Sequence, residues 1–194
     1  CAVVALVGGC ASTPKVVPST PKVIPSTPKV IPSTPKVVPN SPEAKAAIEA
    51  AIRKELKKPT GELTKADYEK VTRLSLSGNQ LTSVKGLEKL TQLTGLYLSD
   101  NQLTDVKGLE KLDQLTRLVL NSNQLTDVPK GLEKLTQLTS LYLNDNKLTN
   151  VKGLENLTQL KELYLGDNPD LTKAQIAELK KALPKCQIIS NPEK

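Results

Sequence analysis

The sequence lacks several residue types on which enzymes and metal sites commonly depend. Its 194 residues include no His, Phe, Trp or Met and only four Tyr. Because histidine is the commonest general base and metal ligand, its absence argues against an enzyme, a metal site or a bound cofactor. The shortage of aromatic residues also means that Leu, Ile and Val must build the core.

Cysteine and concentrated positive charge are also scarce. Of the three cysteines, Cys1 and Cys10 lie near the start and Cys186 lies near the end, so no disulfide framework is expected. The net charge is +7, but residues 71–194 hold 16 basic and 14 acidic groups, so most of the excess lies in residues 1–70. No basic stripe with interleaved aromatic residues is present, and nucleic-acid binding is not expected.

The sequence is rich in one leucine frame, which is written five times between residues 71 and 168. The copies read VTRLSLSGNQLT, LTGLYLSDNQLT, LTRLVLNSNQLT, LTSLYLNDNKLT and LKELYLGDNPDLT, and their central leucines are 22, 22, 23 and 22 residues apart. This period and frame are typical of a leucine-rich repeat solenoid. The predicted fold is therefore α/β, with a parallel sheet on the concave face and short 3₁₀ or helical turns on the convex face.

The alternation of leucines explains why the unit must repeat. Leu74 and Leu76 point to the same face of a short strand, and the residue between them points to the other face. One strand cannot bury its leucines alone, so stacked copies must form a continuous core. The extra residue near Pro129 is expected to bulge outward without moving the strands.

An asparagine follows the leucines of each copy at the point where the strand turns away. An amide there can bond the backbone groups that the turn leaves unpaired, so we interpret these residues as structural. They are Asn79, Asn101, Asn123, Asn146 and Asn168.

The residues that alternate with the strand leucines define the concave face. Three of the four tyrosines fall in its central column, and tyrosine suits protein binding, although cross-strand packing in the sheet would also favour it. The predicted binding residues are Arg73, Tyr97, Arg117, Val119, Asn121, Tyr142, Asn144, Glu162 and Tyr164. Asp100, Asp145 and Asp167 lie near strand ends, but they form no ligand cluster, so calcium is not expected.

Helical caps are predicted at both ends of the repeats. Over residues 41–70, Ser41 followed by Pro42 reads as a helix start, and Thr64 with Asp67 reads as a capping box. Over residues 169–194, Thr172 and Gln175 form a second capping box, and a last strand follows near residues 186–189.

The first forty residues are expected to carry the chain to a membrane rather than to fold. Residues 1–10 read as a signal peptide whose beginning is missing, in which Val7-Gly8-Gly9-Cys10 resembles the lipobox of bacterial lipoproteins. That resemblance implies a lipid on Cys10; an ordinary secretory leader is the alternative. Residues 11–40 repeat a seven-residue unit such as TPKVVPS, which predicts an extended polyproline-like spacer.

The unit LTxLYLxxNxLTxVKGLExLTQ resembles leucine-rich repeat proteins of the internalin kind, and the same frame occurs in a regulatory subunit of protein phosphatase 1. The resemblance covers residues 43–190. It implies binding of a protein or peptide on the concave face. With the lipobox-like leader and the spacer, the expected protein is a monomeric, non-enzymatic module at the bacterial cell surface or outer membrane. Alternatives are a structural envelope protein that packs on peptidoglycan or on neighbouring copies, and an intracellular phosphatase regulator.

Overall fold

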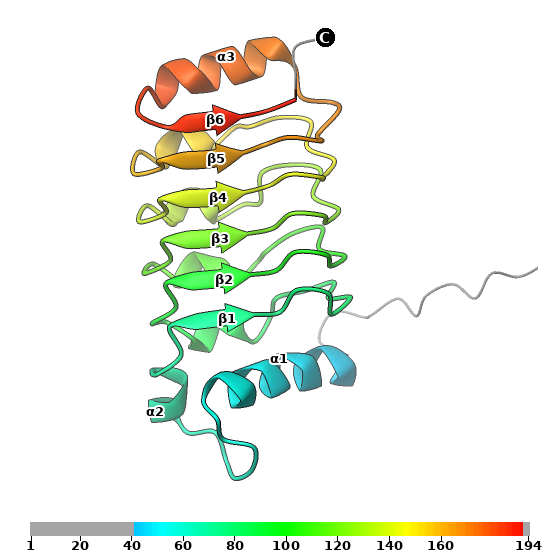
Figure 1. Ribbon diagram of the computed structural model, residues 1–194, viewed down its shortest axis with the longest axis vertical. Helices are drawn as coiled ribbons and strands as arrows, with labels where there is room; N and C mark the ends of the chain where they lie inside the picture. The colour runs from blue at the N-terminus through cyan, green and yellow to red at the C-terminus, as the bar shows by residue number, and fades with distance from the viewer. Residues whose placement is uncertain (1–40, 192–194) are drawn as a thin grey trace, which may run out of the picture. The chain divides into compact units, whose positions relative to one another are not determined.

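The computed structural model describes residues 41–191 (Figure 1). The predicted signal peptide, the spacer over residues 11–40 and the lipidation site at Cys10 lie outside these residues. Six strands form one parallel sheet in which neighbours in sequence are neighbours in space. The strands are β1 (Arg73–Ser75), β2 (Gly95–Tyr97), β3 (Arg117–Val119), β4 (Ser140–Tyr142), β5 (Glu162–Tyr164) and β6 (Gln187–Ile189).

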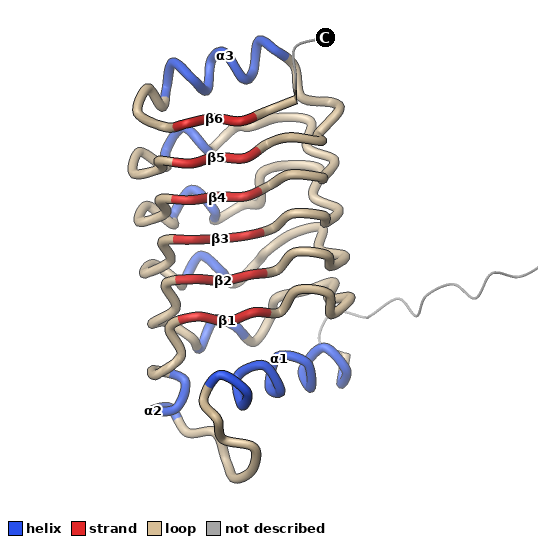
Figure 2. Tube along the Cα trace, in the orientation of Figure 1, coloured by secondary structure: helices blue, strands red, loops and turns tan. Residues whose placement is uncertain are grey.

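Helices lie at both ends of the sheet, and 3₁₀ turns lie behind it (Figure 2). The helices are α1 (Pro42–Glu55), α2 (Lys65–Tyr68) and α3 (Lys173–Ala182); the turns are η1 (Leu87–Lys89), η2 (Leu109–Lys111), η3 (Leu132–Lys134) and η4 (Leu154–Asn156). The predicted leucine-rich repeat solenoid is confirmed. None of the helices within residues 41–191 has the length and hydropathy needed to cross a membrane.

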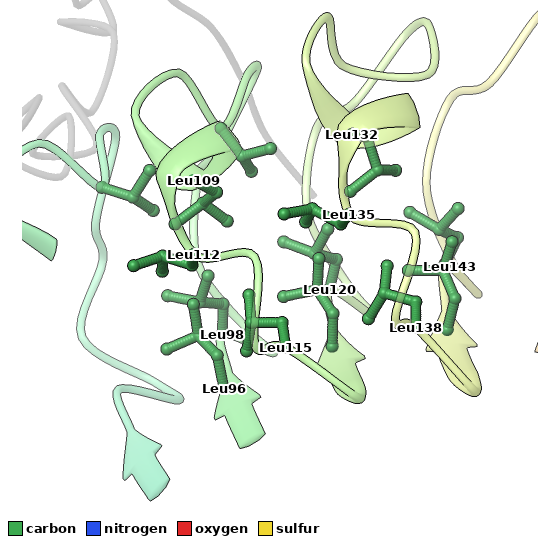
Figure 3. Close-up of a cluster of buried hydrophobic side chains, with 14 of the residues drawn as sticks. Leu96, Leu98, Leu109, Leu112, Leu115, Leu120, Leu132, Leu135, Leu138 and Leu143 are labelled. Carbon is green, nitrogen blue, oxygen red and sulfur yellow. The ribbon is translucent and has the colours of Figure 1, made fainter. Parts of the chain in front are cut away.

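The leucines of successive repeats are stacked in register. On the buried side, Leu96 and Leu98 come from a strand segment, while Leu109, Leu112 and Leu115 come from the return segment, and all five are at most 1% exposed (Figure 3). The first four repeats contribute the same set, and in the fifth the residues of helix α3 follow the two strand leucines. The core is therefore one continuous leucine column, as the period-two alternation predicts.

The extra residue of the third repeat leaves the strand register intact, as predicted, because Leu118 still pairs with Leu141. The expected outward bulge at Pro129 is wrong. Pro129 is buried, and its carbonyl accepts the Leu132 N–H at 3.1 Å, as the carbonyl of Val84 accepts the N–H of Leu87 in the first repeat. Proline thus replaces the core valine, and the displaced Val128 remains half-buried against the core.

Each return segment turns at a glycine in the left-handed region. Gly108 has φ 103°, and its N–H donates to the carboxylate of Glu110 at 2.7 Å. The other repeats place the same Gly-Leu-Glu sequence in the same way. A residue with a β-carbon would be strained there, so the glycine and the following glutamate together set the tight 3₁₀ turn.

Helix α1 closes the N-terminal edge of the core. The Ser41 hydroxyl accepts the Ala44 N–H at 3.2 Å, which confirms the predicted start of the helix. At the other end Lys57 has φ 53°, and the Lys58 N–H donates to the carbonyl of Arg53 at 3.0 Å. This is a Schellman motif with lysine in the position that glycine usually takes.

The short helix α2 carries a charged capping box. Asp67 accepts hydrogen bonds from the Thr64 N–H at 2.9 Å and from Lys58 Nζ at 2.7 Å. The ammonium of Lys58, followed by these Thr64 bonds, holds the pKa of the Asp67 carboxyl well below its usual range. Asp67 as a residue is 9% exposed, and its ion pair with Lys58 joins α2 to the end of α1.

Helix α3 and strand β6 close the other edge. The capping box of Thr172 and Gln175 is present, with the Thr172 N–H donating to Gln175 Oε1 at 2.8 Å. Leu163 pairs with Ile188, which adds β6 as the predicted last strand. Cys186 is half-buried, and burial raises the pKa of its thiol, so the thiol stays protonated and unreactive at neutral pH.

Candidate functional site on the concave face

The solvent side of the six strands forms the concave face defined above, and its central column runs straight across the sheet. The parallel register places Tyr97, Val119, Tyr142 and Tyr164 on adjacent strands, and all four are half-buried. The column ends at Ile189, which is 39% exposed and was missed in the sequence. In the sequence, Ile188 takes the buried position of Leu163 on the last strand. The alternation therefore places the next residue, Ile189, in the column of Tyr164.

The neighbouring column holds the charged residues at the strand starts. In register it reads Arg73, Gly95, Arg117, Ser140, Glu162 and Gln187. Gly95 and Ser140 are buried although they lie on the solvent side. A built β-carbon on Gly95 would lie 3.7 Å from Tyr97 Cε2, so the tyrosine ring covers the small residue beside it.

Tyr142 is the centre of a preformed polar cluster. Its hydroxyl accepts from Arg117 Nη1 at 2.8 Å and donates to Glu162 Oε2 at 3.1 Å. Its ring stacks on that of Tyr164, with centroids 4.6 Å apart and planes inclined by 8°. The guanidinium carbon of Arg117 also lies 5.4 Å from the Tyr142 ring centroid, within cation–π range.

These contacts perturb the Tyr142 hydroxyl. Burial, followed by the hydrogen bond to Glu162, raises its pKa above 10.0, against an opposing effect of Arg117. The hydroxyl therefore stays neutral at physiological pH and keeps its donor role toward Glu162. Packing within the sheet thus accounts for much of the environment of Tyr142 and Tyr164.

The third column, at the strand ends, contains Asn121 and Asn144, which were predicted to bind a ligand. The Asn121 side-chain oxygen accepts the Asn144 N–H at 3.0 Å, and the Asn144 oxygen accepts the Gly166 N–H at 2.9 Å. Each amide oxygen therefore joins one repeat to the next. The structure gives these two residues a role in the sheet edge besides any contact with a ligand.

The asparagine ladder lies behind this edge and is buried from the second repeat onward. The Asn123 amide nitrogen donates to the carbonyls of Leu98, Leu120 and Asn121 at 2.9–3.1 Å, and its oxygen accepts the Leu103 N–H at 3.0 Å. The same pattern of bonds across two repeats surrounds Asn101, Asn146 and Asn168.

Asn79 departs from the ladder. It is exposed, and its amide nitrogen donates only to the carbonyl of Ser77, at 2.9 Å. Helices α1 and α2 precede β1 in place of another repeat, so no earlier strand offers a carbonyl to this amide. The repeated asparagine has its full structural role only where another repeat precedes it.

The aspartates near the strand ends have a backbone explanation. Asp100, Asp145 and Asp167 have φ of 57°, 52° and 55°, a conformation that Asp tolerates better than most residues. Gly78 and Ser122 occupy the same position in the other repeats, with φ of 70° and 53°. The turn therefore explains these residues, and residues 41–191 contain no cluster of three acidic or sulfur groups that could hold a metal ion.

Comparisons with known proteins agree with this architecture. Sequence profiles described as "Leucine Rich repeats (2 copies)" and "Leucine rich repeat" match residues 69–134 and 113–169, respectively. The chain therefore belongs to the leucine-rich repeat class of proteins. Within that class it is internalin-like, because a solved internalin of Listeria monocytogenes is 31% identical with a TM-score of 0.69.

The chain spans only part of these similar proteins. The internalin match covers 82% of this chain and 47% of the internalin. A leucine-rich repeat protein of Leptospira interrogans is 33% identical with a TM-score of 0.59, covering 66% of this chain and 33% of that protein. No curated protein sequence matches. Because 192 chains of solved structures match, the likeness identifies the architecture rather than a ligand.

Proposed function

We propose that the chain is a non-enzymatic protein-binding module, held at the bacterial cell envelope, that presents its concave face to a protein or peptide. Leucine-rich repeat domains are in general protein-interaction scaffolds, which supports the coarser part of this proposal. The finer part concerns which face binds and where the module is held.

The observation that carries the proposal is the contrast between the two sides of the strands. The buried side has leucine on β1 to β5 and isoleucine on β6, whereas the central column on the solvent side reads Ser, Tyr, Val, Tyr, Tyr and Ile. Folding requires the leucines but leaves the other column free to vary. Half-buried tyrosines beside arginines are the composition that protein interfaces favour.

A capture experiment tests the choice of face. The full chain and a Tyr97, Tyr142, Tyr164→Ser triple variant, matched for folding by circular dichroism, are crosslinked in envelope and host extracts. A protein captured by the full chain and lost with the variant supports the concave face. A partner that both proteins capture equally places binding elsewhere and contradicts the proposal.

Anchoring is proposed from the sequence around Cys10. The run Val7-Gly8-Gly9-Cys10 resembles a lipobox, and the proline-containing spacer at residues 11–40 would hold the repeats away from the membrane. Acylation with more than one chain suffices for stable attachment. Metabolic labelling with an acyl probe is expected to mark the chain and to fail for Cys10→Ser; label that persists in the variant would exclude this anchor.

One observation favours a second candidate, the structural envelope protein. Ile189 is 39% exposed on the terminal strand, where a neighbouring copy could cover it. In that case the repeats would lie inside the envelope rather than on the surface. Protease added to intact cells distinguishes the two candidates: digestion of the repeats supports a binding module on the cell surface, and full protection supports the structural protein.

A further inference from the structure

The concave face contains two similar polar arrangements, and only one of them is complete. In the complete set, Arg117 on β3, Tyr142 on β4 and Glu162 on β5 form a chain of hydrogen bonds across three strands. Arginine donates to the tyrosine hydroxyl, and the hydroxyl donates to the carboxylate. Ser140, the small residue in register between the two charged positions, is buried.

The first three strands repeat this arrangement with one difference. Arg73 on β1 and Arg117 on β3 flank Gly95 in register, and Tyr97 covers that glycine. A β-carbon on Gly95 would lie 3.5 Å from Arg73 Cγ and 3.9 Å from the Tyr97 hydroxyl oxygen. Arg73 and Tyr97 thus lean together over Gly95, and Arg117 and Tyr142 meet through their hydrogen bond. On the third strand of each set, the complete set has the acid Glu162 and this set has the base Arg117.

The first set therefore contains no carboxylate to accept from its arginines and its tyrosine. Among residues 41–191, neither the Arg73 side chain nor the Tyr97 hydroxyl makes a hydrogen bond or an ion pair. Arg73 is exposed, and Arg117 offers guanidinium N–H groups beyond the one bonded to Tyr142. The sole carboxylate in the columns of this face, Glu162, already accepts from Tyr142.

We infer that Arg73, Tyr97 and Arg117 form a docking site for a carboxylate of an acidic peptide segment in the protein partner. The site rests on the proposed use of the concave face as a binding surface. The bound Asp or Glu side chain supplies the acceptor that Glu162 supplies on β5. Charge complementarity identifies the occupant, because Arg73 and Arg117 flank Gly95 in register, beside the Tyr97 hydroxyl, and this row of β1 to β3 contains no acid. Charge-assisted bonds to carboxylates are the strong ones.

The experiment selects peptides and then measures single side chains. A phage-displayed library of random dodecapeptides is selected on the full chain, and clones that also bind the triple tyrosine variant are discarded. We expect the remaining peptides to be enriched in Asp and Glu. Arg73→Gln and Tyr97→Phe are each expected to weaken them about tenfold, the scale of a lost hydrogen bond to a charged group.

Matched controls remove the same groups elsewhere. Lys152→Gln deletes one exposed positive charge on a return segment, and Tyr68→Phe deletes a hydroxyl at the N-terminal cap; both are expected to leave the affinity unchanged. In Arg117→Glu an acid within the chain occupies the acceptor position, so acidic peptides should no longer bind. Circular dichroism verifies that each variant is folded.

The outcomes separate this site from the proposed function. Peptides that need the tyrosines but carry no acid, or that bind Arg73→Gln as well as the full chain, overturn the site and leave concave binding intact. Failure to select any tyrosine-dependent peptide overturns both. Displacement of the selected peptides by millimolar inorganic phosphate would show a general anion site and overturn the assignment to an acidic peptide.

Discussion

The two faces of the same six strands use their residues in different ways. Leu96 and Leu118 repeat one side chain in one place and are fully buried, whereas Tyr97 and Val119, one residue further on, differ from strand to strand and are half-buried. The uniform face specifies the fold, and the variable face is available for recognition. Substitutions on the two faces should therefore separate stability from binding.

The largest loss of stability is expected from the core. Leu118→Ala leaves a cavity in a column that cannot close around it, so the free energy of unfolding should fall by about 3–5 kcal/mol. Its neighbour Val119→Ala, on the concave face, should cost within about 1 kcal/mol. Urea denaturation followed by circular dichroism measures both, and equal losses would contradict the division between the faces.

The asparagine ladder should come next. Asn123→Ala removes three donated bonds and one accepted bond at buried backbone groups, so we expect a loss of about 2–4 kcal/mol in the free energy of unfolding. Asn79→Ala is the matched control, since that amide is exposed at the end of the ladder, and it should cost less than about 0.5 kcal/mol. The same denaturation experiment applies, and a large loss at Asn79 would refute the explanation.

A smaller difference is expected within the concave face itself. Tyr142→Ser removes a stacked ring and two hydrogen bonds, so it should lower the free energy of unfolding by about 1–2 kcal/mol. Tyr97→Ser removes a ring with no stacked partner and should cost less. Denaturation of the two variants in parallel tests this order; its reversal would show that Tyr97 is the more structural tyrosine.

The smallest effect is expected from acid at the cap that seals the leucine core. The folded-state pKa of Asp67 lies below its ordinary value of 3.8, so the unfolded chain binds the proton more tightly. The stability contributed by Asp67 is therefore fully present above that value and is lost as the pH falls below it. Melting temperatures should fall more steeply below pH 3.8 for the full chain than for Asp67→Asn, and parallel curves would contradict this role.

Much of the fold follows from the sequence because each repeat states the same local pattern. The leucine alternation specifies the strand faces, and the Gly-Leu-Glu sequence specifies the return turn. The failure at Pro129 is instructive, since the extra residue could enter the core or leave it. Pro129 fills the core position that valine has in the other repeats, and its carbonyl still accepts the hydrogen bond from the 3₁₀ turn. The spacing of the repeats does not show that proline takes the place of valine.

The site was less predictable than the fold. The columns of the concave face follow from alternation, so Tyr97, Tyr142 and Tyr164 could be placed in advance. Which side chains touch depends on the conformation of each side chain, and this conformation depends on residues of the neighbouring repeats. The hydrogen-bonded set around Tyr142 has Glu162 on the strand that follows the tyrosine, whereas the set around Tyr97 has Arg117 in that position. This difference can be recognised only when the register of the strands is known.

The most direct test of the central claim uses Tyr97→Ser in the full chain and measures two quantities on one sample. The melting temperature is recorded by circular dichroism, and capture of the partner identified with the full chain is measured under the same conditions. We predict an essentially unchanged melting temperature with loss of capture, because Tyr97 lies on the face that recognition uses. A lowered melting temperature with capture retained would contradict the account and make the tyrosine column part of the fold.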